Sequence, residues 1–188
     1  METKNLRVLI VSPEVVPFAK TGGLADVTGA LPKVLAQLGH QVKVILPKYK
    51  MVDENKFYLS EVKADFPVIS IGGKNHKISL KSDRVDFPPV EYLFMVNDEF
   101  YFRDELYRNR ATGYDYEDND ERFILFARGT LEILKTLGWQ PDIIHVNDWQ
   151  SALIPAYLKT SYADDPFFKG TASIFSIHNL AYQGGFPK

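Results

Sequence analysis

The sequence predicts an α/β fold: a Rossmann-like, mostly parallel, doubly wound sheet with a β-hairpin insertion. Strand and helix patterns alternate along the 188 residues, the first strands are almost continuous apolar runs, and short glycine-bounded strands interrupt the middle of the chain. Continuous apolar runs are typical of parallel strands, because helices cover both faces of such a sheet. A hydrophobic content of 45% can supply a sizeable core, and the length fits one domain rather than two.

The N-terminal part of the chain predicts a strand–helix–strand unit. The first strand is Leu6–Ser12, apolar residues at helical spacing follow over Gly23–Leu38, and the second strand is Val42–Leu46. Gly39 is placed to end the helix as its C′ residue. Pro32 lies inside the helix, where proline removes a hydrogen bond and costs about 3 kcal/mol, so we expect a kink or a helix in two pieces. The two strands should be parallel, joined by a right-handed connection.

The middle of the chain predicts a hairpin insertion at residues 57–90. Val68–Ile71 and Ile78–Lys81 read as short strands, with a Gly-Gly pair after the first of them. Tyr92–Val96 is a strong strand signal, and the polar, aromatic residues 97–116 read as a loop.

The last third of the chain predicts helix, strand, helix and strand. The first helix starts near Asp118, with acidic residues in its first turn to complement the helix dipole. Strand Asp142–Val146, helix Gln150–Tyr162 and strand Ala172–Ile177 then complete the doubly wound pattern. No helix follows to cover the last strand, so we expect residues 1–188 to be an incomplete N-terminal domain of a longer protein. The expected buried face of the first helix is Phe123, Ile124, Ala127, Leu131 and Leu134.

Composition and charge argue against several classes of protein. The 22 basic and 24 acidic residues are nearly balanced, whereas a nucleic-acid binder needs clustered basic residues. The absence of cysteine excludes disulfide scaffolds, thiolate metal sites and cysteine nucleophiles. No apolar run approaches the roughly 18 residues that span a bilayer, and Met1–Asn5 lacks the layout of a signal peptide. We therefore expect a cytoplasmic protein with no membrane or nucleic-acid partner.

Three segments with unusual side chains follow predicted strands, and ligands of open α/β sheets bind beyond the carboxyl ends of the strands. In the first segment, Lys20–Val27, two glycines lead into a helix. Free N–H groups and the helix dipole favour an anion there, and Lys20 adds a positive charge suited to phosphate. The segment is neither a dinucleotide fingerprint nor a phosphate loop ending in Gly-Lys-Ser/Thr. A plain helix N-terminus with a glycine turn is the alternative.

The second segment is His145–Gln150, at the end of an apolar strand. His145 and Asp148 could ligate a metal, but no third ligand lies nearby in the sequence, so we predict no metal site. In a purely structural interpretation, Asp148 or Asn147 caps the next helix and Trp149 packs in the core. In the competing interpretation the segment binds carbohydrate: the carboxylate and amide bind hydroxyl groups, and the indole covers the apolar face of a sugar.

The third segment, Ser176–Gly185, delivers several polar side chains from a strand that we expect to be buried. Such groups are costly unless a ligand, water or neighbours pair with them, so the segment favours a ligand site. A Ser–His–Asp hydrolase is disfavoured, because Ser12 is followed by proline and the chain has no Gly-x-Ser-x-Gly elbow.

Together the three segments resemble the motifs of a known family. Lys20–Val27, followed by Gly29–Pro32, looks like the N-terminal signature of bacterial glycogen synthases and plant starch synthases. His145–Trp149 and His178–Gly184 resemble the next two motifs of that family, in the same order. The resemblance runs from the first strand to the last residue.

The resemblance implies the N-terminal half of a GT-B glycosyltransferase, in which two Rossmann-like domains face each other. Such an enzyme transfers glucose from ADP-glucose to the non-reducing end of an α-1,4-glucan, with retention of configuration and without a metal or other cofactor. The C-terminal domain, which holds most of the donor, is absent from these residues. We therefore expect this part alone to be inactive, with that domain as its partner. The implied location is the cytoplasm of a bacterium, or the plastid of a plant.

The resemblance also implies roles for individual residues. Lys20 and the glycine turn would meet the donor phosphates, because negative charge builds on the leaving diphosphate. Tyr101 would be a donor-site contact, although the Tyr-Phe-Asp-Arg run that is common in the family is Tyr-Phe-Arg-Asp here. The expected catalytic residues are His178 and Asp26, and the expected substrate-binding residues are Lys20, Gly22, Gly23, Asp148, Trp149, Asn179 and Tyr101.

Two other functions stay open. The same cleft could bind glucan without catalysis, or the protein could be a GT-B transferase that uses another nucleotide sugar, such as UDP-glucose. A dinucleotide oxidoreductase is disfavoured, because the chain lacks a Gly-x-Gly-x-x-Gly turn.

Overall fold

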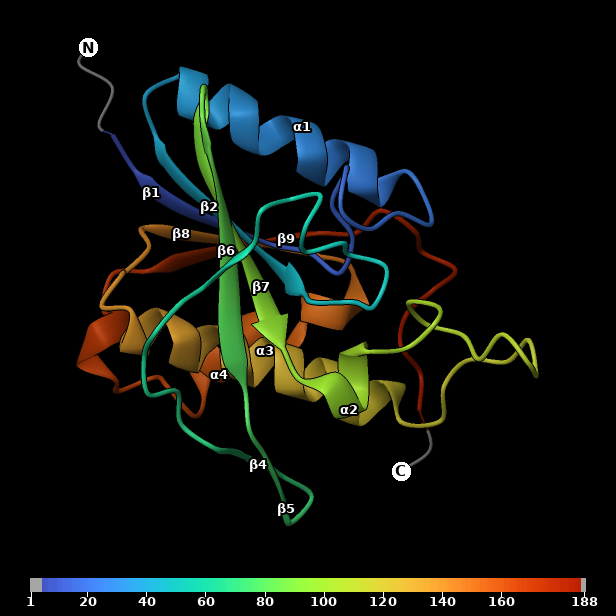
Figure 1. Ribbon diagram of the computed structural model, residues 1–188. Coiled ribbons are helices and arrows are strands. Elements are labelled where there is room, and N and C mark those ends of the chain that lie inside the picture. The colour runs from blue at the N-terminus through green and yellow to red at the C-terminus, as the bar shows by residue number, and fades with distance from the viewer. Residues whose placement is uncertain (1–4, 187–188) are drawn as a thin grey trace.

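The computed structural model describes residues 5–186, which form one seven-stranded sheet with helices on both faces and a separate small hairpin (Figure 1). The strands are β1 (Arg7–Val11), β2 (Gln41–Pro47), β3 (Ser60–Glu61), β4 (Ile69–Ile71), β5 (Lys74–His76), β6 (Ser79–Asp86), β7 (Pro89–Val96), β8 (Ile143–Asn147) and β9 (Ala172–Ser176). The helices are α1 (Leu24–Gln37), α2 (Asp98–Tyr101), α3 (Asn119–Thr136) and α4 (Leu153–Lys159), with 3₁₀ turns η1 (Trp149–Ser151) and η2 (Pro166–Phe168).

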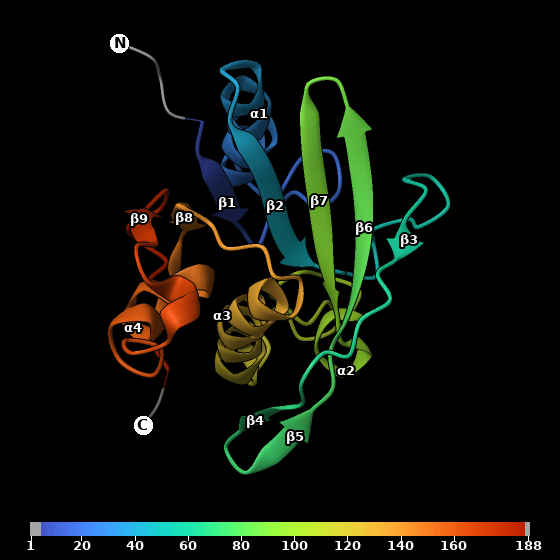
Figure 2. The same ribbon diagram turned by 90° about the vertical axis from the view of Figure 1, so that its left-hand side faces the viewer.

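The strand order is β3-β6-β7-β2-β1-β8-β9, and all pairs from β7 to β9 are parallel. Only β6 and β3 at one edge are antiparallel. Helix α1 covers one face of the sheet, whereas α3 and α4 cover the other (Figures 1 and 2). The predicted α/β class, with a mostly parallel, doubly wound sheet, is therefore confirmed.

The central strands are buried as their apolar runs predict. Val8–Val11 of β1 are at most 5% exposed, since β2 and β8 flank them and helices cover both faces. In α3, four of the five residues expected on the buried face are buried, and Ile124 is intermediate. The middle of the chain forms two hairpins, β4–β5 and β6–β7, which confirms the predicted insertion.

Helix α1 runs without interruption through Pro32, so the expected division into two pieces is wrong; the proline is buried against the core. The helix ends as predicted at Gly39, whose φ of +92° suits glycine. The Gly39 and His40 amides donate to the carbonyl groups of Ala36 and Leu35, which completes a Schellman motif.

Only part of the apolar spacing that predicts α1 matches its buried face: Leu24 is buried, and Leu31 and Leu35 are partly buried against the core. Val27, Val34 and Leu38 are 43–64% exposed. The helix instead packs through small residues, because it lies close to the loop that follows β1. Its buried residues are Leu24, Ala25, Thr28, Gly29, Pro32 and Ala36.

Three other expectations need correction. The expected loop at 97–116 contains the short helix α2. The Asn97 side chain caps its first turn by accepting a hydrogen bond from the Phe100 amide at 3.0 Å. The helix expected over Gln150–Tyr162 is divided into η1 and the shorter α4. Strand β9 is exposed rather than buried, because it pairs only with β8 and forms the edge of the sheet.

The expectations about a signal peptide and about the chain end rest partly on residues 1–4, 187 and 188, which lie outside the described residues. Within residues 5–186, no helix combines the length and apolar character needed to cross a membrane.

Gly29 lets α1 approach the preceding loop closely. A Cβ atom at Gly29 would lie 2.7 Å from the Val16 carbonyl oxygen. A Cβ atom at Gly129 in α3 would instead crowd the flexible end of Met95, at 2.8 Å from its Cε, and would make an ordinary contact with Ile78 at 3.5 Å. We expect Gly29→Ala to lower the free energy of unfolding by about 2 kcal/mol, since overpacking against backbone cannot relax. Gly129→Ala should cost less, because Met95 can move. Urea denaturation of both variants tests this order, and a Gly29→Ala protein as stable as Gly129→Ala would contradict it.

Candidate functional site

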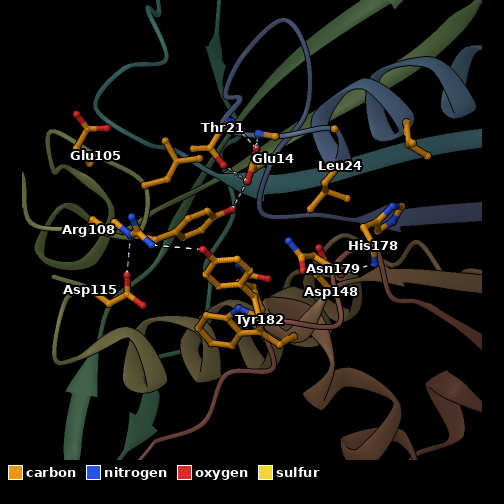
Figure 3. Close-up of a pocket in the computed structure, with 17 residues that line it drawn as sticks. Glu14, Thr21, Leu24, Glu105, Arg108, Asp115, Asp148, His178, Asn179 and Tyr182 are labelled. Atoms are coloured by element: carbon orange, nitrogen blue, oxygen red, sulfur yellow. Dashed lines mark hydrogen bonds and ion pairs between the residues drawn. The ribbon is translucent and has the colours of Figure 1, made fainter. Parts of the chain in front are cut away.

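The carboxyl ends of β1, β8 and β9 meet beside the N-terminus of α1, and a cavity of ≈ 650 Å³ lies there (Figure 3). The strand order reverses at this point, because β1 leads to β2 on one side and pairs with β8 on the other. Ligands of open α/β sheets bind at such switch points. The structure thus brings together all three segments that the sequence analysis selected. The lining residues are Glu14, 21–24, 27, 105–108, 115, 148–150, 178, 179 and 182.

Glu14 is the most buried charged group in the cavity wall, at 4% exposed. Its Oε2 accepts hydrogen bonds from the amides of Thr21 and Gly22 at 2.5 and 3.1 Å. Its Oε1 accepts from the Thr21 hydroxyl at 2.6 Å and from the Tyr107 hydroxyl at 2.9 Å. Burial raises the pKa of Tyr107 well above its ordinary value, so this hydroxyl keeps its proton and donates. Glu14 therefore joins the glycine turn to the loop that carries Tyr107.

The contact with Glu14 changes what the glycine turn can offer a ligand. The Gly22 amide already donates to Glu14, so it is not free to bind an anion as the sequence analysis expects. The first amides of a helix have no acceptor within the helix, and Gly23 directly precedes α1. A Cβ atom at either glycine would meet nothing within 4 Å, so the turn is open to a ligand.

Lys20 and Asp26 lie at the rim of the site and pair with each other. The Lys20 Nζ lies 2.6 and 2.7 Å from the two carboxylate oxygens of Asp26. Both side chains are about half exposed, at 51% and 56%, and neither lines the cavity. An exposed pair of this kind contributes little stability, so either side chain can exchange its partner for a ligand.

Asp148 connects the ends of β8 and β9. Its Oδ1 accepts from the His178 amide at 2.6 Å, and its own amide donates to the Ser176 carbonyl at 2.9 Å. It begins η1, but its side chain does not cap that turn. Its φ of +54° and ψ of 178° are rare for a residue other than glycine, and such strain is concentrated at functional sites.

The His178 ring is oriented by Asn147, which is fully buried. The Asn147 Nδ2 donates to the carbonyl groups of Val11 and His145 at 3.2 and 3.3 Å, so its Oδ1 is the acceptor for the His178 Nε2, at 2.9 Å. The Nε2 of His178 therefore carries a proton, which leaves Nδ1 to meet a ligand.

The His145 side chain is engaged between the ends of β8 and β9. Its Nε2 lies 2.8 Å from the Ser176 Oγ, and burial, with a smaller contribution from the nearby His178, lowers its pKa. The described part of the chain holds no group of three or more histidine, aspartate and glutamate side chains that could bind a metal ion.

Trp149 lines the cavity, but its ring is packed among other side chains. A Cβ atom at Gly184 would overlap the indole, and Phe123 and Phe186 lie 5.1 and 5.4 Å from it between ring centroids. The indole face is thus covered, so the predicted stacking of a sugar on Trp149 is not supported by this arrangement. Asn179 does line the cavity, and its Oδ1 accepts from the Ala181 amide at 3.0 Å.

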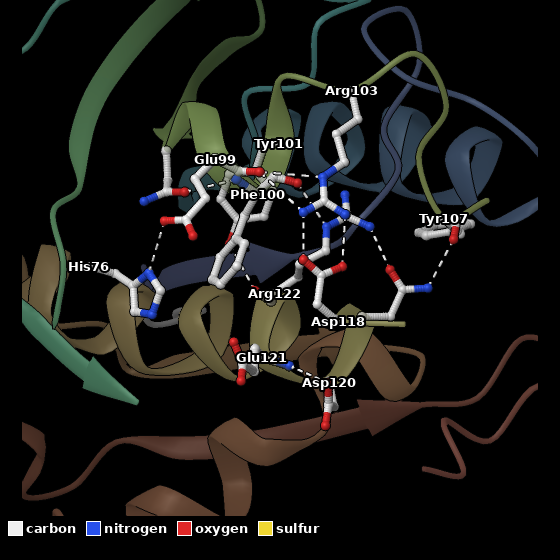
Figure 4. Close-up of polar contacts among 12 residues, drawn as sticks. His76, Glu99, Phe100, Tyr101, Arg103, Tyr107, Asp118, Asp120, Glu121 and Arg122 are labelled. Atoms are coloured by element: carbon white, nitrogen blue, oxygen red, sulfur yellow. Dashed lines mark hydrogen bonds and ion pairs between the residues drawn. The ribbon is translucent and has the colours of Figure 1, made fainter. Parts of the chain in front are cut away.

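Tyr101 is not brought to the cavity. It is fully buried, burial raises its pKa, and its hydroxyl donates to the Arg122 carbonyl at 2.9 Å (Figure 4). The Arg122 guanidinium is buried as well, and it donates to Asn119 Oδ1 at 2.5 Å; Asn119 in turn donates to the Tyr107 carbonyl at 2.9 Å. Tyr101 therefore belongs to a network that supports the loop carrying Tyr107.

The cavity wall is acidic. Arg108 is the only lysine or arginine among the described lining residues. The four carboxylates that line the cavity belong to Glu14, Glu105, Asp115 and Asp148. Carboxylates accept hydrogen bonds from hydroxyl groups and repel phosphates. The cavity is therefore suited to a neutral ligand rich in hydroxyl groups, while the α1 N-terminus with Lys20 suits an anion.

Comparisons with known proteins agree with this geometry. Residues 7–188 match the family described as the starch synthase catalytic domain. The whole chain is 44% identical to glycogen synthase of Desulforudis audaxviator, and 97% of it is 47% identical to glycogen synthase 2 of Geobacter sulfurreducens. It spans 37% of the length of each. The chain is thus a homologue of bacterial glycogen synthases.

A solved structure shows the same fold. The catalytic domain of starch synthase IV from Arabidopsis thaliana, bound to ADP and acarbose, superposes with a TM-score of 0.79 at 33% identity. The match covers 96% of this chain and 35% of that one.

We expect Glu14→Gln to lower the free energy of unfolding by about 2 kcal/mol. The amide that replaces one carboxylate oxygen would face N–H or O–H donors, which leaves buried groups unpaired. Glu105→Gln is the matched control, because Glu105 lines the same cavity and is only partly buried; its effect should stay within about 0.5 kcal/mol. Urea denaturation provides the comparison. Equal stabilities of the two variants would show that Glu14 does not hold the site together.

Proposed function

Because this chain belongs to the starch synthase catalytic domain family, we propose that it is the N-terminal, glucan-binding part of a retaining glucosyltransferase. The donor is ADP-glucose and the acceptor is the non-reducing end of an α-1,4-glucan. The observation that carries this proposal is the acidic cavity at the strand-order switch point, lined by all three motif segments and placed beside a helix N-terminus. One part of the site suits sugar hydroxyl groups and the adjoining part suits a diphosphate.

His178 is the proposed catalytic residue of this chain. Its Nε2 is held by Asn147, so its Nδ1 presents a fixed hydrogen-bonding atom to the transferred glucose. Asp148 and Asn179 adjoin it, and their oxygen atoms bind sugar hydroxyl groups. Asp148 also holds the His178 amide, so the backbone and the ring of His178 are both fixed.

Lys20 and the N-terminus of α1 stabilise the leaving group. Breaking the bond between glucose and the diphosphate builds negative charge, and the helix dipole and an ammonium group offset it. The proposed role of Asp26 is to hold the Lys20 ammonium group beside the glycine turn. When the donor binds, its diphosphate replaces the Asp26 carboxylate as the partner of Lys20. The Gly23 amide lies at the same helix end. Tyr101 acts through the buried network rather than by contact with the donor.

A second, donor-binding domain completes the site in this proposal. The relatives are longer than this chain, which covers 37% of the first two, so their length leaves room for such a domain. We place the enzyme in the cytoplasm of a bacterium. Transfer requires both domains, so residues 1–188 alone should show no activity.

In the full-length protein, we expect His178→Ala to lower the rate of glucose transfer from ADP-glucose to glycogen about 100-fold, because a fixed hydrogen bond at the reacting sugar is lost. A radiolabelled donor measures the rate. His40→Gln, at the opposite end of the sheet, is the matched control and should keep the wild-type rate.

Two results would contradict the proposal. Transfer by residues 1–188 alone would remove the need for a donor domain. A wild-type full-length protein that binds glucan but transfers no glucose would instead identify a glucan-binding module.

A further inference from the structure

We propose a second sugar subsite at the mouth of the cavity, in which Tyr182 stacks on one glucose unit of an α-glucan while Arg108 and Asp115 bind its hydroxyl groups. This inference rests on the proposed function, because it specifies how the acceptor is held.

Tyr182 is the aromatic side chain with an open ring among the described residues that line the cavity. Three aromatic residues line it: Tyr107, Trp149 and Tyr182. The Tyr107 hydroxyl is bound to Glu14 and its partly buried ring packs against Phe123, while the Trp149 indole is covered by Gly184. Tyr182 is 56% exposed. Its hydroxyl lies 3.5 Å from the Arg108 Nη2, at the limit of a hydrogen bond (Figure 3). This weak contact directs the Tyr182 side chain toward Arg108 without fixing its ring tightly.

Arg108 and Asp115 supply the polar contacts that a sugar needs. They lie opposite each other in the loop that faces Tyr182, and the Arg108 Nε donates to the Asp115 Oδ1 at 3.2 Å. Both side chains are exposed, at 57% and 60%. The guanidinium has further N–H groups and the carboxylate a further oxygen, which suit adjacent hydroxyl groups.

The combination of ring and charges matches one class of ligand. A glucose unit has an apolar face of C–H groups and an equatorial belt of hydroxyl groups. The C–H groups are attracted to the negative face of an aromatic ring, and the hydroxyl groups reach the charged pair at its edge. A phosphate would meet only one cation here, already paired with a carboxylate.

The mouth is distinct from the inner part of the cavity. The inner part carries Asp148, which accepts a hydrogen bond from the His178 amide, and Glu14, which accepts hydrogen bonds from the glycine turn. The hydrogen bonds and the ion pair of the Tyr182, Arg108 and Asp115 side chains join these three residues to one another and not to Glu14, Asp148 or His178, and all three lie at the exposed rim. Two zones of this kind hold two different glucose units, so affinity should rise with chain length.

The test is calorimetric binding of α-1,4-linked oligosaccharides of two to seven units to the full-length protein and its variants. We expect Tyr182→Ala to weaken binding of the longer oligosaccharides about tenfold, while the disaccharide, held by the inner part, changes less than twofold. Tyr182→Phe should keep most of the affinity, because the ring remains. In transfer assays, Tyr182→Ala should raise KM for the glucan more than it lowers kcat.

Tyr114→Ala is the matched control. Tyr114 is 78% exposed in the same loop as Arg108 but does not line the cavity, so its removal should leave binding unchanged. Circular dichroism verifies that each variant is folded, and Arg108→Gln provides a second variant, expected to weaken long-chain binding about threefold.

The outcomes separate the two proposals. If wild-type protein binds the oligosaccharides but Tyr182→Ala and Arg108→Gln bind them equally well, the subsite is wrong and the proposed function stands. If Tyr182→Ala weakens the disaccharide as much as the longer chains, there is no separate subsite. If wild-type protein binds no oligosaccharide at all, the proposed function itself fails.

Discussion

The buried carboxylate of Glu14 is the interaction on which the arrangement of the candidate site depends. Removing a carboxylate from water is costly unless hydrogen bonds replace its hydration. Four donors do so here, from the backbone and side chain of Thr21, the backbone of Gly22 and the hydroxyl of Tyr107. These donors come from two loops more than 80 residues apart in the sequence, as the separations of 7 and 93 residues from Glu14 show. Folding of one wall of the cavity is therefore coupled to folding of the other.

The loop that carries Tyr107 is held in turn by side chains of α3. Asn119 at the start of α3 donates to the Tyr107 carbonyl and accepts from Arg122, whose guanidinium also donates to the Phe100 carbonyl at 2.8 Å. A buried guanidinium is tolerated only where such acceptors are fixed. The network thus explains why α2 lies beside α3, and it gives Tyr101 a structural role under the site. The Glu14 carboxylate thus holds the glycine turn on one side of the cavity, and the network holds Tyr107 on the other.

Much of the fold follows from patterns that are local in sequence. Alternating strand and helix signals predict the parallel sheet, and the rule that ligands bind at the carboxyl ends of strands predicts that Lys20–Val27, His145–Gln150 and Ser176–Gly185 meet. What the sequence does not reveal are contacts between distant residues. Glu14 follows a buried strand, which is a usable signal, but its partner Tyr107 has none. Three further features likewise depend on tertiary packing: Gly184 covers the Trp149 indole, Tyr101 is buried, and several apolar residues of α1 are exposed.

The central claim is that one carboxylate couples both walls of the cavity. Hydrogen–deuterium exchange of the full-length protein, compared between wild type and Glu14→Gln, tests it most directly. Exchange reports local opening, and the Thr21 and Gly22 amides donate to Glu14 itself. The account predicts faster exchange in both the 19–24 and the 105–116 segments of the variant. Faster exchange confined to residues 19–24, with 105–116 unchanged, would show that the two walls are held independently and would contradict it.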